Sequence, residues 1–201
     1  MNAAQEIDAG ALDTYGFGAR GIVWWGVMAF IAIETVMLGL TAAAYGYLYL
    51  NAPEWPPGRL LPAWHWPTIN LALLLASLVP MVWTARTARR FEERGVAIGL
   101  LICCALGAAS CLIRPLEFRA LNTAWDRNAY SSVVWTLLGL HTTHLVAEVV
   151  ETIVITIWFL RGARAPRTWV DVGDNALYWY FIVGAWVPVY GLIVWFPRLV
   201  G

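Results

Sequence analysis

Five long apolar segments constrain the fold of this chain more than any other feature. A transmembrane helix needs about 17–25 predominantly apolar residues, and each segment falls within or above this range. The expected helices span residues 22–50, 68–84, 96–113, 131–159 and 176–196. We therefore expect an all-α, polytopic membrane protein, folded as a bundle of five transmembrane helices.

Composition supports a membrane protein and excludes several functional classes. The chain is 60% hydrophobic and 13% charged, whereas soluble domains are about 45–50% apolar and about 25% charged. Thirteen basic and thirteen acidic residues balance, so we expect no nucleic-acid partner. There is no nucleotide-binding loop, serine nucleophile elbow or cysteine ligand set. Three histidines do not suit a haem or copper centre. We expect no catalytic, cofactor or metal site in this chain alone.

The arginines predict an orientation in the membrane. The side that holds the N-terminus receives eight of them: Arg20, Arg86, Arg89, Arg90, Arg94, Arg161, Arg164 and Arg167. The opposite side receives four: Arg59, Arg119, Arg127 and Arg198. Positively charged loops favour the cytoplasm, so the N-terminus is predicted inside and the C-terminus outside. Residues 1–20 then form a cytoplasmic segment, and residues 21–201 form a single transmembrane domain.

A polar stripe interrupts the fourth apolar segment, in the stretch HTTHLVAEVVE. At about 100° per residue, His141, His144, Glu148 and Glu151 fall within an arc of roughly 80° that must face the protein interior. His141 and Glu151 are about 15 Å apart along the helix axis, so the four cannot bind one metal ion. Four interpretations remain: a hydrogen-bond ladder, a proton-linked stripe, a metal held by His144 and Glu148 with other helices, or a contact with a partner subunit.

Three further ionisable residues lie in or beside apolar segments. Glu34 falls near the middle of the first segment, where a carboxylate is costly unless it is protonated, hydrogen-bonded or facing the bundle interior. It is either a proton-linked or subunit-contacting acid or a neutral packing residue. Arg114 and Glu117 are spaced i, i+3 at the exit of the third segment, beside Pro115. This spacing predicts a partly buried structural ion pair.

Two arginine clusters could contact anionic lipid headgroups, although membrane topology explains them equally well. Their members are Arg86, Arg89, Arg90, Arg161 and Arg164.

Four stretches combine aromatic, small and polar residues in a distinctive order: WWGVMAFIAIETVMLGLTAAAYGYL, WPP, HTTH and YWYFIVGAWVPVY. Their order and spacing over residues 21–195 resemble subunit III of the haem–copper (cytochrome c) oxidases, in its five-helix bacterial form. The matching positions are Gly26, Phe30, Glu34, Tyr45, Trp55, Pro56, Pro57, Asn70, His141, His144, Tyr178, Trp179, Phe181, Trp186 and Tyr190. Departures occur at Tyr180 and Val183, where the family usually has histidine and aspartate. They also occur at 114–118, and at Glu148 and Glu151, which replace small or apolar residues.

The resemblance implies an accessory core subunit of a respiratory terminal oxidase that carries no redox centre. Such a subunit packs against catalytic subunit I, stabilises its active site and supports proton uptake, while haem and copper belong to partner subunits. The complex would be a cytochrome c oxidase or a quinol oxidase in the bacterial inner membrane. Longer relatives hold phospholipid in a cleft flanked by two additional N-terminal helices, so bound phospholipid and contacts with membrane lipids are further implications.

Two alternatives remain open. One is a subunit III-like component of a nitric oxide reductase assembly, which belongs to the same family. The other is an independent proton or metal transporter that uses the polar stripe as its path.

Overall fold

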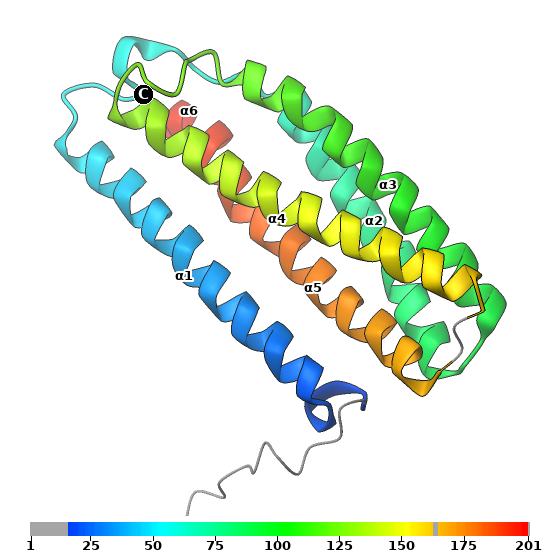
Figure 1. The fold of residues 1–201 in the computed structure, drawn as a ribbon. Helices are drawn as coiled ribbons and strands as arrows, with labels where there is room; N and C mark the ends of the chain where they lie inside the picture. The colour runs from blue at the N-terminus through cyan, green and yellow to red at the C-terminus, as the bar shows by residue number, and fades with distance from the viewer. Residues whose placement is uncertain (1–15, 163–164, 201) are drawn as a thin grey trace, which may run out of the picture.

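The described part of the chain contains five long helices, which form the bundle shown in Figure 1. The computed structural model describes residues 16–162 and 165–200. Short 3-10 turns lie at Gly18–Arg20 and Pro57–Arg59. A π-helical turn, Gly191–Trp195, joins the last long helix to the short helix α6, Phe196–Val200. The long helices are α1 (Ile22–Asn51), α2 (His65–Arg89), α3 (Glu93–Ala120), α4 (Ala129–Leu160) and α5 (Pro166–Tyr190).

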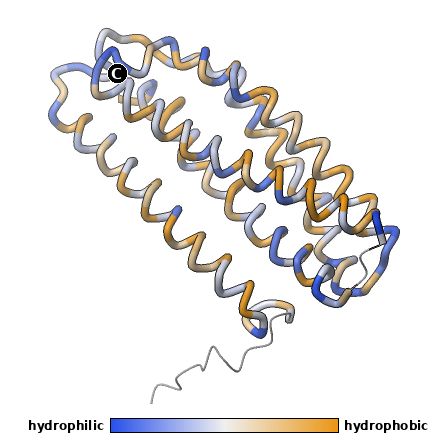
Figure 2. Tube along the Cα trace, viewed as in Figure 1, coloured by the Kyte–Doolittle hydropathy of each residue, from blue (hydrophilic) through white to orange (hydrophobic). Residues whose placement is uncertain are grey.

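All five helices are long and apolar enough to cross a membrane, the fifth counted through α6. Helices suit this environment because they satisfy the backbone hydrogen bonds of each span within that span. Figure 2 shows hydrophilic residues gathered mainly at the two ends of the bundle. The predicted all-α, five-helix membrane fold is confirmed, and the chain is a multi-pass membrane protein. Its orientation remains a prediction.

Helices α2 and α3 extend beyond their apolar segments by three to seven residues at each end, whereas the ends of α1 and α4 lie within two residues of the expected positions. The largest difference is at α5, which begins at Pro166 rather than at the expected residue 176. Proline is favoured at the first helical position, because the N–H that it lacks would be unpaired there. The polar residues of the first turns hid this start from a search for apolar runs.

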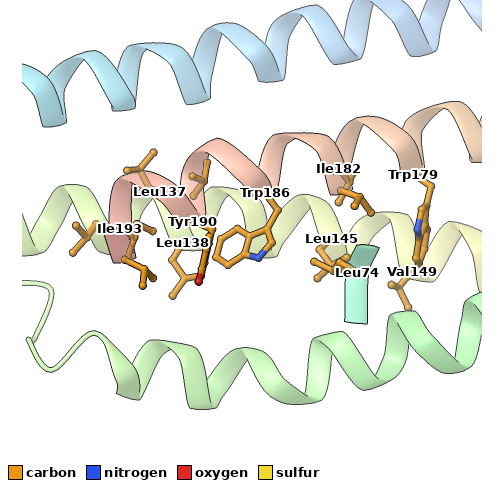
Figure 3. Close-up of a cluster of buried hydrophobic side chains, with 14 of the residues drawn as sticks. Leu74, Leu137, Leu138, Leu145, Val149, Trp179, Ile182, Trp186, Tyr190 and Ile193 are labelled. Carbon is orange, nitrogen blue, oxygen red and sulfur yellow. The ribbon is translucent and has the colours of Figure 1, made fainter. Parts of the chain in front are cut away.

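Helix α5 lies at the centre of the bundle, in contact with α1, α2 and α4. Half of the residues in its apolar, membrane-spanning stretch are buried, compared with 11% in that of α1. Trp179 and Trp186 are each 1% exposed, and Figure 3 shows them packed among Leu74, Leu145 and other apolar side chains. The indole N–H of Trp179 donates to Ser77 Oγ at 2.9 Å. This bond satisfies the one polar group that a buried tryptophan brings into the core.

Close packing of α3 on α2, α4 and α5 depends on small residues of α3. A Cβ built on Gly99 would lie 2.0 Å from Thr84 Oγ1. A Cβ on Gly107 would lie 2.7 Å from Val149 Cγ2 and 2.8 Å from Trp179. Small residues at these contacts let neighbouring backbones approach closely, a common basis of helix association in membranes.

Candidate functional site

Glu34 attaches α1 to the rest of the bundle through polar contacts. Its side chain is 1% exposed, although α1 buries little else. The hydroxyl of Tyr178 on α5 donates a hydrogen bond to Glu34 Oε1. His144 Nε2 on α4 lies 3.5 Å from the same oxygen. Phe30 packs beside both partners, with its ring 5.4 Å from Tyr178 and 6.2 Å from His144.

Three helices therefore meet at one carboxyl group. An unpaired carboxyl group in hydrocarbon is costly, so these contacts favour the position of α1 in which Glu34 faces Tyr178 and His144. Glu34 Oε2 has no hydrogen-bond partner among the described residues. The site can thus accept one further donor or hold a proton on that oxygen.

Glu148 occupies a separate polar site between α4 and α5. It is 0% exposed, and its Oε1 accepts a hydrogen bond of 2.8 Å from Asn175 Nδ2. Asn175 Nδ2 also lies 3.0 Å from Thr152 Oγ1. Glu148 Oε2 has no hydrogen-bond partner within the described ranges. One buried carboxyl oxygen therefore stays available to a proton.

A third site surrounds Arg114, which is 2% exposed. Its Nη1 lies 2.5 Å from Glu117 Oε2, and its Nη2 lies 2.6 Å from His141 Nδ1. The guanidinium stacks on Trp186, 4.1 Å from the ring centroid. His141 Nε2 lies 2.9 Å from the carbonyl oxygen of Ile182. A buried charge of this kind needs an opposite charge and additional hydrogen bonds, and Arg114 has both.

The structure divides the polar residues that the sequence placed on one stripe. His144 joins Glu34, Glu148 joins Asn175, and His141 joins Arg114. Glu151 differs from expectation because it is exposed on the chain, so it does not belong to the buried set. Arg114 and Glu117 also lie inside α3, which continues through Pro115 to Ala120, rather than at a helix exit.

Asn175 was missed because the fifth helix was expected to begin at residue 176. Asn175 follows Gly173 and Asp174, and glycine, aspartate and asparagine in succession are typical of a loop. The signal that could have found it is the i, i+3, i+4 spacing of Asn175, Tyr178 and Trp179. This spacing places the three side chains on one face of a helix.

The geometry does not support a metal held by His144 and Glu148. These residues contact different partners, and within residues 16–162 and 165–200 no group of three or more histidine, cysteine or acidic side chains is placed to hold a metal. The arginines expected to contact lipid, Arg86, Arg89, Arg90 and Arg161, are exposed. Arg164 lies outside the described residues.

Comparison with known proteins identifies the family. The family model "Cytochrome c oxidase subunit III" matches residues 16–198. Cytochrome c oxidase subunit 3 of Thermostichus vulcanus is 24% identical over 170 residues, which cover 84% of each chain. The horse (Equus caballus) protein of the same name is 25% identical over 181 residues, covering 85% of this chain and 68% of the relative. The Myxine glutinosa protein is 26% identical over 146 residues, covering 70% of this chain and 55% of the relative. Because the family model spans nearly all of the sequence, this chain belongs to the cytochrome c oxidase subunit III family and is an accessory oxidase subunit.

Proposed function

We propose that this chain packs against the catalytic haem–copper subunit of a respiratory terminal oxidase and stabilises it. The match to the subunit III family over residues 16–198 carries this proposal. Haem, copper and the oxygen chemistry belong to partner chains, and this chain supports proton uptake by the complex. The N-terminus faces the cytoplasm of a bacterium, as the arginine distribution predicts.

The Glu34 site gives the proposal a role for individual residues. Helix α1 lies at the edge of the bundle, in contact mainly with α4 and α5. Glu34 and Tyr45 are its buried side chains, so the contacts of Tyr178 and His144 with Glu34 contribute to its attachment. A partner that packs on the bundle requires α1 in a fixed position. Loss of the contacts at Glu34 should therefore displace α1 and weaken the complex with the partner.

Replacing Glu34 with alanine tests this role in the intact complex. Removing the carboxyl leaves the Tyr178 hydroxyl unpaired, a cost of about 1–3 kcal/mol, and loosens α1. We expect Glu34→Ala and His144→Ala to lower the amount of assembled complex and to shorten its active life during turnover. Thr35→Val is the matched control, because this exposed neighbour bonds only to the carbonyl of Ile31 in its own helix.

The measurement is the ratio of co-purified catalytic subunit to tagged chain, followed by oxygen consumption over many turnovers. Full assembly and sustained activity in both the Glu34 and the His144 variants would contradict the role of this site. The nitric oxide reductase and transporter alternatives find no specific support in the fold, the site or the relatives.

A further inference from the structure

Acidic side chains lie at graded depths between the arginine-rich end of the bundle and the middle of the span. Helices α1 and α5 begin, and α4 ends, at this end (Figure 1). From the rise per residue of a helix, Asp171 lies about 8 Å from the start of α5, and Glu151 lies about 14 Å from the end of α4. Glu148 and Glu34 both lie about 18 Å from the ends of their helices. We call these residues, Asp171, Glu151, Glu148 and Glu34, the acid line.

The acid line runs from the polar layer of the membrane into the hydrocarbon. The 32 residues of α4 span about 48 Å, so a helix centred on a hydrocarbon layer of about 30 Å has about 9 Å of each end in the polar layer. Asp171 falls within that layer, Glu151 lies just inside the hydrocarbon, and Glu148 and Glu34 lie well inside it. Exposure agrees with these depths: the Asp171 side chain is 21% exposed and Glu151 is exposed, whereas Glu148 and Glu34 are 0% and 1% exposed.

Each member of the acid line lies within electrostatic range of the next. Asp171 is in range of Glu151, and Glu151 is in range of Glu148. Glu148 is in turn in range of Glu34. The hydroxyl of Tyr178, which donates to Glu34, also lies in range of Glu148 and Glu151. The line therefore offers a group that can accept a proton at every step from the polar layer to Glu34.

The two buried members each have a carboxyl oxygen that suits a proton. Oε1 of Glu148 accepts from Asn175, and Oε1 of Glu34 accepts from Tyr178. Oε2 of each residue has no hydrogen-bond partner among the described residues. Two charged carboxylates within range of each other inside a span are costly. A proton on each Oε2 removes both charges, while the amide of Asn175 and the hydroxyl of Tyr178 hold the other oxygen in place.

The cations near the acid line also favour a protonated Glu148. Arg167 lies 3.8 Å from Asp171, at the polar end of the line. Arg86 and Arg89 of α2 share a cavity with Asp174. His144 lies 3.5 Å from Glu34. Glu148 has no ion-pair partner in the described part of the chain, so a proton is the positive charge that can neutralise it.

We propose that Glu148 is a proton carrier that connects Glu34 with the aqueous phase at the arginine-rich end of the bundle. Glu148 and Glu34 each hold a proton at rest. When Glu34 gives up its proton, Glu148 passes one to it and is reprotonated from Glu151, which exchanges protons with water directly and through Asp171. Each step moves one proton between two carboxyl oxygens, so no other reactant is needed. The inference deepens the proposed support of proton uptake and rests on it for its purpose.

Hydrogen–deuterium exchange at Glu34 tests the path. The full-length chain, purified with the subunits that accompany it, is transferred rapidly from H₂O to D₂O. Infrared spectroscopy follows the carbonyl stretch of protonated carboxyl groups, which shifts on deuteration, and the Glu34→Gln variant identifies the Glu34 band by difference. We expect this band in the wild-type chain. Glu148→Gln should slow its exchange at least about 100-fold, the lower end of the contribution of a positioned proton donor.

Further variants separate proton transfer from a structural role. Glutamine at position 148 keeps an acceptor oxygen for Asn175, so a purely structural role predicts unchanged exchange in Glu148→Gln. Glu148→Asp restores an acid and should recover most of the rate. Glu151→Gln should also slow the exchange, and it tests the path if the Glu148 variants do not fold. Asp126→Asn is the control, because it removes an exposed acid of the α3–α4 loop at the opposite end of the bundle, and it should leave the rate unchanged.

Three outcomes would overturn the proposal. The first is the absence of a protonated Glu34 band from the wild-type chain. The second is unchanged exchange in Glu148→Gln, or in Glu151→Gln if only that variant folds. The third is slowing in Asp126→Asn as large as that in Glu148→Gln. Exchange is measured at Glu34 itself, so unchanged exchange in a fully assembled complex would remove the path alone, whereas loss of the catalytic partner would count against the accessory role.

Discussion

Replacing Arg114 with methionine tests whether the buried ion pair holds α3 to its neighbours. Methionine keeps much of the volume but removes the charge, leaving Glu117, which is 1% exposed, without its partner at 2.5 Å. Removing one member of a buried pair costs about 3–5 kcal/mol, because the remaining charge stays buried. The substitution also removes the contacts with His141 and Trp186, so we expect a loss at the upper end of this range.

The assay is unfolding by sodium dodecyl sulfate in mixed micelles, followed by tryptophan fluorescence and by helical circular dichroism. The matched control is Arg119→Met, because Arg119 is an exposed arginine on the same helix and should change the free energy of unfolding by less than about 0.5 kcal/mol. Glu117→Met should be destabilising, and the double variant should be markedly more stable than the sum of the two single losses predicts. Equal losses at Arg114 and Arg119, or fully additive losses at Arg114 and Glu117, would show that the buried ion pair does not hold α3 to its neighbours.

Two further predictions use the same unfolding assay. Gly99→Ala should cost about 1–3 kcal/mol through overpacking, because the added Cβ meets Thr84 Oγ1 at 2.0 Å. Gly46→Ala, in a helix position with open space, should be stabilising by up to about 1 kcal/mol; a loss there as large as at Gly99 would contradict the packing explanation. Glu148→Ala should cost about 1–3 kcal/mol by leaving the Asn175 amide without its acceptor. Glu148→Gln, which keeps an acceptor oxygen, should lose clearly less, and equal losses in these two variants would show that the hydrogen bond is unimportant.

The sequence was sufficient to predict the number of helices but not their ends. A span of about 20 apolar residues is a physical requirement of the bilayer, so the helices could be counted from hydropathy. Helix ends in the polar layer have no such requirement, and the start of α5 at Pro166 was therefore placed ten residues too late. That error removed Asn175 from the expected helices and with it the partner of Glu148.

The partners of the polar residues could not be predicted from one helix. Helical spacing correctly places His141 and His144 on one side of α4, yet a separation of three residues rotates them by roughly 60°. That rotation is enough to direct His141 to Arg114 on α3 and His144 to Glu34 on α1. Which neighbouring helix lies on which side is decided by packing between segments far apart in the sequence.

We expect this chain to work as an accessory subunit beside a haem-containing catalytic chain. The most direct test is to purify the tagged chain from its native membrane in a mild detergent and to record a reduced-minus-oxidised absorbance spectrum of what accompanies it. We expect a large partner chain with a haem spectrum and with oxygen consumption. A colourless protein without a partner, obtained under conditions that preserve membrane complexes, would contradict this role.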